Sequence, residues 1–137
     1  MLNNKEIINF QPPNLLIKRF CEDNQISEIE AKELFEETKK FLVLCALNKE
    51  VSYSPSKEID EMWHQFLLHS KAYHDFCSKV GIFLHHEPSE KSEIEMYART
   101  LKDMEALYGK LNSAYWAPGE TSAGHCGHCS SCGSSAH

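Results

Sequence analysis

Long apolar runs are absent from this sequence of 137 residues. The longest, residues 41–47, is far shorter than the roughly 20 apolar residues that a membrane-spanning helix needs. The first residues also lack the apolar stretch that follows a charged start in a secretory signal. We therefore expect a cytoplasmic protein, in which cysteines stay mostly reduced and clusters of them act as ligands or redox groups.

An excess of basic residues is missing as well. The chain has 14 Lys and Arg against 20 Asp and Glu, which gives a formal net charge of −6 at pH 7. Nucleic acids and anionic lipids both attract basic surfaces, so we expect neither nucleic acid nor membrane among the partners. The sequence also lacks a Gly-rich phosphate loop and a Gly-x-Ser-x-Gly elbow, which are signatures of two large enzyme classes.

Helical patterns fill most of the chain, whereas no alternating strand pattern of useful length occurs. Ser27 and Glu30 form a capping box before an apolar pattern that predicts a helix over residues 29–47. Similar reasoning predicts a short helix around residues 15–20, helices over residues 56–69 and 70–80, and one after Ser92. Residues 82–88 fit an extended stretch or a buried turn. We expect an all-α fold, a compact bundle of about four to five helices over residues 1–118.

Histidine and cysteine are plentiful, with 8 and 6 residues. Many of them lie in residues 119–137, a segment rich in Ser and Gly that we expect to be a flexible, disordered tail without a core of its own. Cys-x-x-Cys spacing lets two thiolates reach one tetrahedral metal ion. The tail residues predicted as ligands are His125, Cys126, His128, Cys129 and Cys132. Two alternatives are a redox dithiol and a low-complexity tail whose Cys and His are incidental.

A second candidate site lies in the helical part. Asp60 and His64 stand four residues apart on one predicted helix, so both project from the same face. If the chain folds back after Gly81, His85 or His86 returns to that face, and Cys77 is a further possible ligand. Such a site suits Zn, Fe or Cu. The alternative is that these residues bind no metal. Asp60 and His64 would then form a helix-surface ion pair, Cys77 would be a buried small hydrophobic residue, and the His85-His86 segment would form a hydrogen-bonded corner.

The remaining cysteines and histidines have ordinary interpretations. Cys21 and Cys45 fall on apolar helix faces and are predicted to pack in the core. His69 and His74 are predicted to be exposed helix positions.

Residues 40–90 resemble the glycine-rich domain-containing protein-like family, in particular its small bacterial-type members. The resemblance rests on an Asp-x-x-Trp-His element, a later Tyr and Cys, and a closing His-His-x-Pro. The matching positions are Asp60, Trp63, His64, Tyr73, Cys77, His85 and His86. The resemblance implies an α-helical domain and supplies no activity. The tail departs from the family pattern because it has more Ser and His than Gly.

These features predict a small protein that binds a transition metal, with zinc as the default ion and copper or iron as alternatives. It would act as a metal chaperone, buffer or sensor and exchange metal with a protein partner. One alternative is a metal-dependent enzyme with an open His/His/carboxylate site, where Asp60 or Glu61 serves as base and Tyr73 as acid. The others are a metal-free helical interaction module and a tail that another enzyme modifies.

Overall fold

The structure is a computed structural model of the chain. It describes the side chains of residues 4–86 and 93–118, and the backbone alone of residues 87–88 and 127–131.

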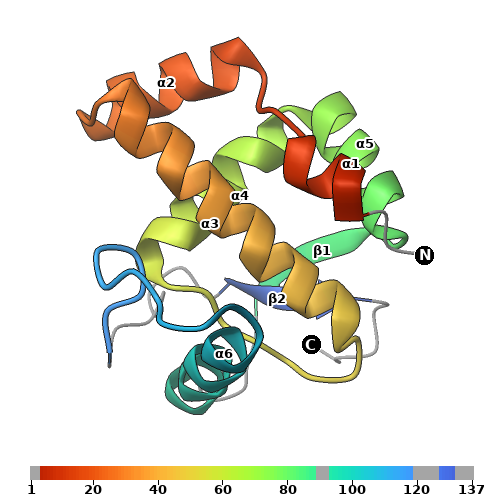
Figure 1. Cartoon of the computed structure of the whole chain (residues 1–137). Coiled ribbons are helices and arrows are strands. Elements are labelled where there is room, and N and C mark those ends of the chain that lie inside the picture. The colour runs from red at the N-terminus through yellow and green to blue at the C-terminus, as the bar shows by residue number, and fades with distance from the viewer. Residues whose placement is uncertain (1–3, 89–92, 119–126, 132–137) are drawn as a thin grey trace.

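Six helices and two short strands make up this described part (Figure 1). The helices are α1 (Asn4–Asn9), α2 (Asn14–Asn24), α3 (Glu28–Leu47), α4 (Lys57–Leu68), α5 (Ser70–Val80) and α6 (Glu93–Tyr108). The strands are β1 (Leu84–Pro88) and β2 (Gly127–Ser131). The expectation of a mostly helical protein is therefore confirmed.

Local sequence signals explain where the helices begin and end. The Ser27 side chain accepts a hydrogen bond from the Glu30 amide, and the Glu30 carboxylate accepts one from the Ser27 amide, which completes the capping box before α3. Ser56 caps α4 by accepting from the Ile59 amide at 3.2 Å. Gly81 ends α5 with φ at 92°, a left-handed conformation that favours glycine.

Helix α3 is the central element of the fold. It contacts α2, α4, α6 and both strands (Figure 1). Its apolar face includes Phe35 and Phe41, which are fully buried. The Phe35 ring lies 5.0 Å from that of Phe66 in α4, and the Phe41 ring lies 5.8 Å from that of Trp63. Aromatic pairs at these separations stabilise the core beyond their buried area, so they fix α4 against α3.

A buried lysine of α3 attaches the N-terminal helix α1 to the rest of the fold. The Lys39 ammonium donates to the main-chain carbonyls of Ile7, Ile8 and Phe10 at 2.9–3.2 Å. The last carbonyls of a helix have no partner within it, so Lys39 satisfies the C-terminal end of α1. Its own charge is balanced by Glu36, 3.0 Å away.

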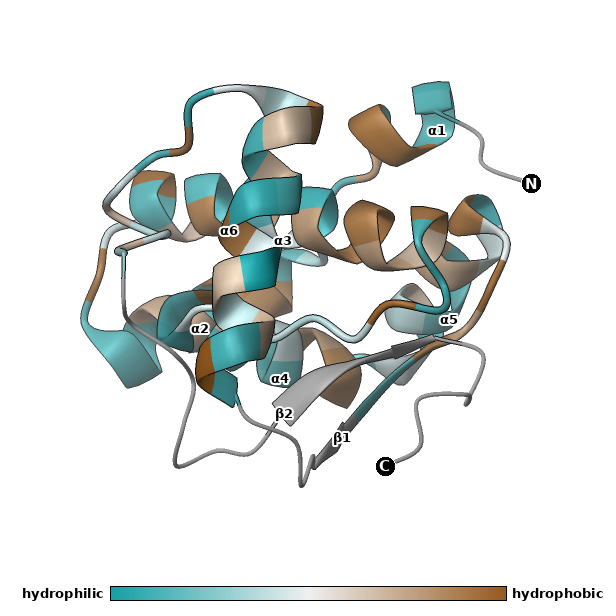
Figure 2. Cartoon of the chain, turned by 90° about the horizontal axis from the view of Figure 1, so that it is seen from below, coloured by the Kyte–Doolittle hydropathy of each residue, from teal (hydrophilic) through white to brown (hydrophobic). Residues whose placement is uncertain are grey.

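The two strands were not predicted as strands. They pair antiparallel, with Leu84 opposite Ser131, His86 opposite Cys129 and Pro88 opposite Gly127. Figure 2 shows β1 running along one edge of the helical cluster. Residues 82–88, which fitted either an extended stretch or a turn, thus contain a strand. Part of the segment expected to be a disordered tail supplies its partner.

No helix of the described residues is both long enough and apolar enough to span a membrane. This agrees with the shortness of the apolar runs in the sequence.

The capping box gives a first prediction. Replacing Ser27 by Ala removes the side-chain acceptor for the Glu30 amide, and we expect the free energy of unfolding to fall by about 1 kcal/mol in chemical denaturation. Ser78→Ala, at an exposed position within α5, is the matched control and should leave stability nearly unchanged. Equal effects of the two substitutions would show that the cap contributes nothing.

Candidate metal centre

Helix α4 positions the first two residues of the site. Asp60 lies in its first turn, where a carboxylate interacts favourably with the helix dipole, and its side chain is fully buried. His64 follows one turn later. Its Nδ1 lies 3.1 Å from the main-chain oxygen of Asp60 and 3.8 Å from the carboxylate Oδ2. The His64 side chain is 52% exposed, so this side of the site faces solvent.

Strand β1 delivers the third residue, His86. Its Nε2 lies 2.5 Å from Asp60 Oδ1, and its side chain is only 6% exposed. The His86 ring lies 4.2 Å from the His64 ring and 4.3 Å from that of Trp63, centroid to centroid. Asp60, His64 and His86 each offer one ligand atom, and these three atoms lie within 4.8 Å of one another. We call these three residues the His/Asp cluster.

One carboxylate oxygen of the cluster accepts no hydrogen bond from the described residues. This atom, Asp60 Oδ2, is buried. A buried carboxylate is costly unless charged or hydrogen-bonding groups compensate for its lost hydration. The carboxylate therefore has one oxygen satisfied by His86 and one available to a further cationic group.

A buried hydrogen-bond chain holds β1 against α4. The Trp63 Nε1 donates to the Tyr73 hydroxyl at 3.0 Å, and that hydroxyl donates to the main-chain carbonyl of Leu84. Trp63 precedes His64 in α4, and Leu84 lies two residues before His86 in β1. Tyr73, from α5, thus fixes the strand that carries His86 to the helix that carries Asp60 and His64. Burial raises the pKa of Tyr73 well above its ordinary value, so the hydroxyl keeps its proton.

Two predicted ligands are not brought to the cluster. The thiol of Cys77 is buried and lies beside Tyr73 and the backbone of Leu84, and burial raises its pKa. His85 is exposed, and its ring packs against Phe83 at 4.8 Å. Because side chains alternate between the two faces of a strand, β1 can present only His86 to α4. His85 and His86 are therefore not interchangeable.

Most of the predicted tail site lies outside the described residues. This holds for His125, Cys126 and Cys132 altogether, and for the side chains of His128 and Cys129. Cys45 is buried, as expected for core packing, but it is also joined in a disulfide. Sequence reasoning missed this bond, although an even number of cysteines was a possible signal.

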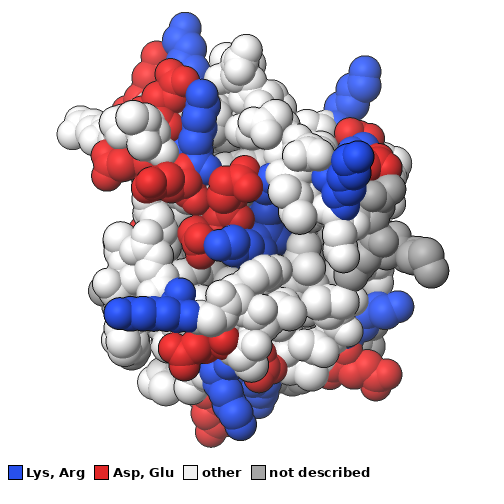
Figure 3. All heavy atoms as spheres, viewed as in Figure 1, with Lys and Arg blue, Asp and Glu red and all other residues white. Residues whose placement is uncertain are grey.

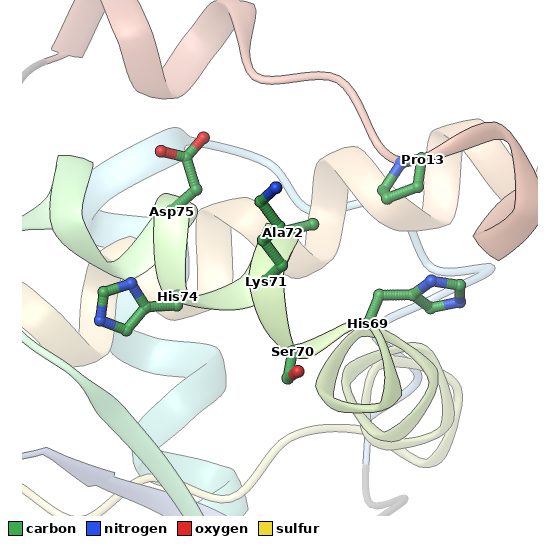
Figure 4. A pocket seen from close by; sticks show the side chains of 7 residues that line it. All are labelled: Pro13, His69, Ser70, Lys71, Ala72, His74 and Asp75. Atoms are coloured by element: carbon green, nitrogen blue, oxygen red, sulfur yellow. The ribbon is translucent and has the colours of Figure 1, made fainter.

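The histidines of α5 and its cap take no part in the cluster. Figure 4 shows the side chains of His69 and His74 pointing in different directions beside a pocket at the start of the helix, which Pro13 and Asp75 also line. His74 is exposed as predicted, and His69 is half-buried. Burial, with a smaller contribution from Arg19, lowers the pKa of His69.

Five pockets in the described part of the chain lie beside other residues. They are lined by residues of α1, α3, α4, α5 and α6 and of the loops beside them, and none of the five includes Asp60, His64 or His86. None of them therefore provides a substrate cavity at the cluster.

The fold and the cluster together define a small helical protein with a His/His/carboxylate centre at the junction of α4 and β1. A family model matches residues 3–104, which is most of the chain, and the protein belongs to the UCP032817-like family. This corrects the expectation from the sequence, since the matching family is not the glycine-rich domain-containing one. The family is uncharacterised, so membership assigns no activity. No curated protein and no solved structure matches the chain.

Tyr73 provides the second prediction. Tyr73→Phe leaves the buried Trp63 N–H and the Leu84 carbonyl without their partner, and each unsatisfied group costs about 1–3 kcal/mol. We expect a clear fall in the free energy of unfolding, measured by urea titration.

The control for this substitution is Tyr115→Phe, which removes a solvent-exposed hydrogen bond to Glu33. It should cost much less because water can replace the lost contact. A Tyr73→Phe protein as stable as the control would contradict the proposed positioning of β1.

Proposed function

We propose that this protein binds a transition-metal ion at Asp60, His64 and His86 and serves as a metal chaperone, buffer or sensor. The observation that carries the proposal is the buried Asp60 carboxylate. One of its oxygens contacts His86, and the other accepts no hydrogen bond from the described residues and lies 3.8 Å from His64 Nδ1. Two imidazoles and a carboxylate are a common donor set for Zn²⁺ and Fe²⁺.

The geometry of the cluster suits an ion after a small movement. Two ligands of one tetrahedral zinc ion lie about 3.3 Å apart, given metal–ligand distances near 2 Å. The 2.5 Å between His86 Nε2 and Asp60 Oδ1 is shorter, because these two atoms are in direct hydrogen-bond contact. An ion between them would replace that contact and separate the two atoms by somewhat less than 1 Å. Because metal ligands must be deprotonated, binding would weaken at low pH.

The accessibility of the three residues supports exchange of the ion. His86 and Asp60 are buried, which fixes their positions, whereas His64 is half-exposed and faces solvent. An ion held this way has an open side through which a partner's ligand could approach. We propose zinc as the default ion, with copper and iron as alternatives, and a protein partner that donates or receives it.

A metal-dependent enzyme is the second candidate. The same open side favours it, because catalytic metal sites keep one position for water or substrate. The five pockets of the described residues are not lined by the cluster, and this supports binding over catalysis. In the third candidate, the interaction module, the Asp60–His86 pair has a structural purpose alone.

The surface supports the absence of nucleic acid and membrane from the proposed partners. On the face in Figure 3, acidic and basic side chains are interspersed, and acidic ones gather at the upper left. Glu28, Glu33 and Glu36 of α3 contribute to the acidic excess of the chain. A cytoplasmic location also remains part of the proposal.

The third prediction compares adjacent histidines. His86→Asn should lower the affinity for Zn²⁺ about tenfold or more, measured with a competing chelator on protein without a His tag, because loss of a ligand costs at least as much as loss of its supporting partner. His85→Asn, one residue earlier on the opposite strand face, is the matched control and should bind as the unchanged protein does.

His64→Asn is a second test in case His86→Asn disturbs folding. His64 is half-exposed, and its replacement leaves the Asp60–His86 contact intact. It should also weaken binding. Equal affinities of the His85 and His86 variants, or a wild-type protein that refuses Zn²⁺, Cu⁺ and Fe²⁺, would overturn the metal proposal and favour the interaction module.

The fourth prediction separates the helical domain from the tail. Elemental analysis of chains with and without residues 121–137 should find metal in both forms if the His/Asp cluster binds an ion by itself. Metal only in the full-length chain would assign the ion to the tail or require the tail for binding.

A further inference from the structure

The two oxygens of the Asp60 carboxylate lie beside different imidazoles. Oδ1 is 2.5 Å from His86 Nε2, whereas Oδ2 is 3.8 Å from His64 Nδ1 and, although buried, accepts no hydrogen bond from the described residues. The two imidazole rings are close to each other as well, with their centroids 4.2 Å apart. An ion bound by both imidazoles would therefore lie beside both carboxylate oxygens.

The donor atoms that converge at the cluster are nitrogen and oxygen. Among the described residues, the converging group is Asp60, His64 and His86 and includes no cysteine. Cys77, the described cysteine nearest to His86 in the sequence, is buried beside Tyr73 and the backbone of Leu84 instead. Thiolate and thioether ligands select Cu⁺, whereas imidazole suits zinc, iron, nickel and Cu²⁺. The three converging residues therefore suit divalent transition metals and lack the thiolate that Cu⁺ prefers.

The harder divalent ions are disfavoured for the opposite reason. Ca²⁺ takes about six to eight oxygen ligands, and Mg²⁺ requires a nearly octahedral set of oxygens, several of them from water. The cluster supplies a single carboxylate, and its other two donors are imidazole nitrogens. Neither Mg²⁺ nor Ca²⁺ would gain enough from these three side chains to give up its water.

We propose that the His/Asp cluster selects a divalent ion of the series from Mn²⁺ to Zn²⁺ and holds it by both imidazoles and both oxygens of Asp60. This inference rests on the metal-binding function proposed above and names the class of ion. The half-exposed side of His64 leaves further positions to water or to a ligand of the partner, so the ion has five or six ligands. Structural zinc sites, by contrast, are four-coordinate and closed.

The selection narrows the range of ions that the protein would exchange. In a reducing compartment copper is mainly Cu⁺, for which the cluster has no thiolate among the described residues. The cluster would then carry zinc or ferrous iron. When different divalent ions are offered separately, the affinity should rise from Fe²⁺ through Co²⁺ and Ni²⁺ to Cu²⁺ and fall again at Zn²⁺, which is the usual order for nitrogen and oxygen ligands.

The fifth prediction compares the unchanged full-length chain with His86→Asn, one ion at a time, by competition with a chelator. The variant should bind Zn²⁺ and Co²⁺ about tenfold or more weakly, because it lacks one ligand. Its affinity for Cu⁺ should equal that of the unchanged chain, and a large excess of Mg²⁺ should not displace Zn²⁺ from either. Since both chains share every other ligand, the difference between them reports the cluster alone.

Two further variants complete the comparison. His64→Asn should repeat the selective loss of Zn²⁺ and Co²⁺ at a half-exposed position, where folding is not at risk. His85→Asn, whose side chain is exposed and packs against Phe83, should leave the affinity for every ion unchanged.

The visible spectrum of bound Co²⁺ tests the number of ligands. The difference between the spectra of the unchanged chain and His86→Asn should be the weak absorption of five- or six-coordinate Co²⁺, and the intense band of tetrahedral Co²⁺ would overturn the role of the second Asp60 oxygen. Equal weakening of Cu⁺ and Zn²⁺ binding would overturn the selection of divalent ions and leave metal binding itself standing. No weakening for any ion would instead reject the proposed function, and this inference with it.

Discussion

The burial of the Asp60 carboxylate is the constraint on which the arrangement around α4 depends. A charge without exposure to solvent must be compensated, and in this structure the compensation comes from His86, on a segment distant in sequence. The strand β1 must therefore lie close enough to α4 for the His86 side chain to contact Asp60. Tyr73 then holds that course by joining the Trp63 indole to the Leu84 carbonyl. The Asp60–His86 contact and the hydrogen-bond chain attach the same strand to the same helix at neighbouring points.

Local signals in the sequence were enough to predict every helix of the described residues except α1, and to place Asp60 and His64, two of the three cluster residues, side by side. Capping residues marked the starts of α3 and α4, and Gly81 marked the end of α5. The spacing of Asp60 and His64 was informative because helix geometry places them on one face. The choice between His85 and His86 needed tertiary information, since it depends on which face of β1 meets α4.

The strands escaped prediction for a different physical reason. Pairing of β1 with β2 uses backbone groups, which every residue except proline supplies in full, so the Ser- and Gly-rich composition of β2 gave no signal. The same composition predicts that this segment has no core of its own. Cys45 illustrates a similar limit. A cysteine on an apolar helix face looks like a small hydrophobic residue, and its bonding is decided by which distant chain segment the fold places beside it.

The contact with α4 and the pairing with β2 both involve His86. His86 faces Asp60 through its side chain and pairs with the β2 backbone in the register of the sheet. An interaction that fixes β1 against α4 therefore also places the edge of β1 where β2 can pair with it. Pairing with β2 in turn restricts the motion of His86. Coupling of this kind is reciprocal, because two interactions that favour the same position of a strand must stabilise each other by the same free energy. Under the proposed function, a metal ion at the cluster would then favour pairing of β1 with β2, and that pairing would strengthen metal binding to an equal degree.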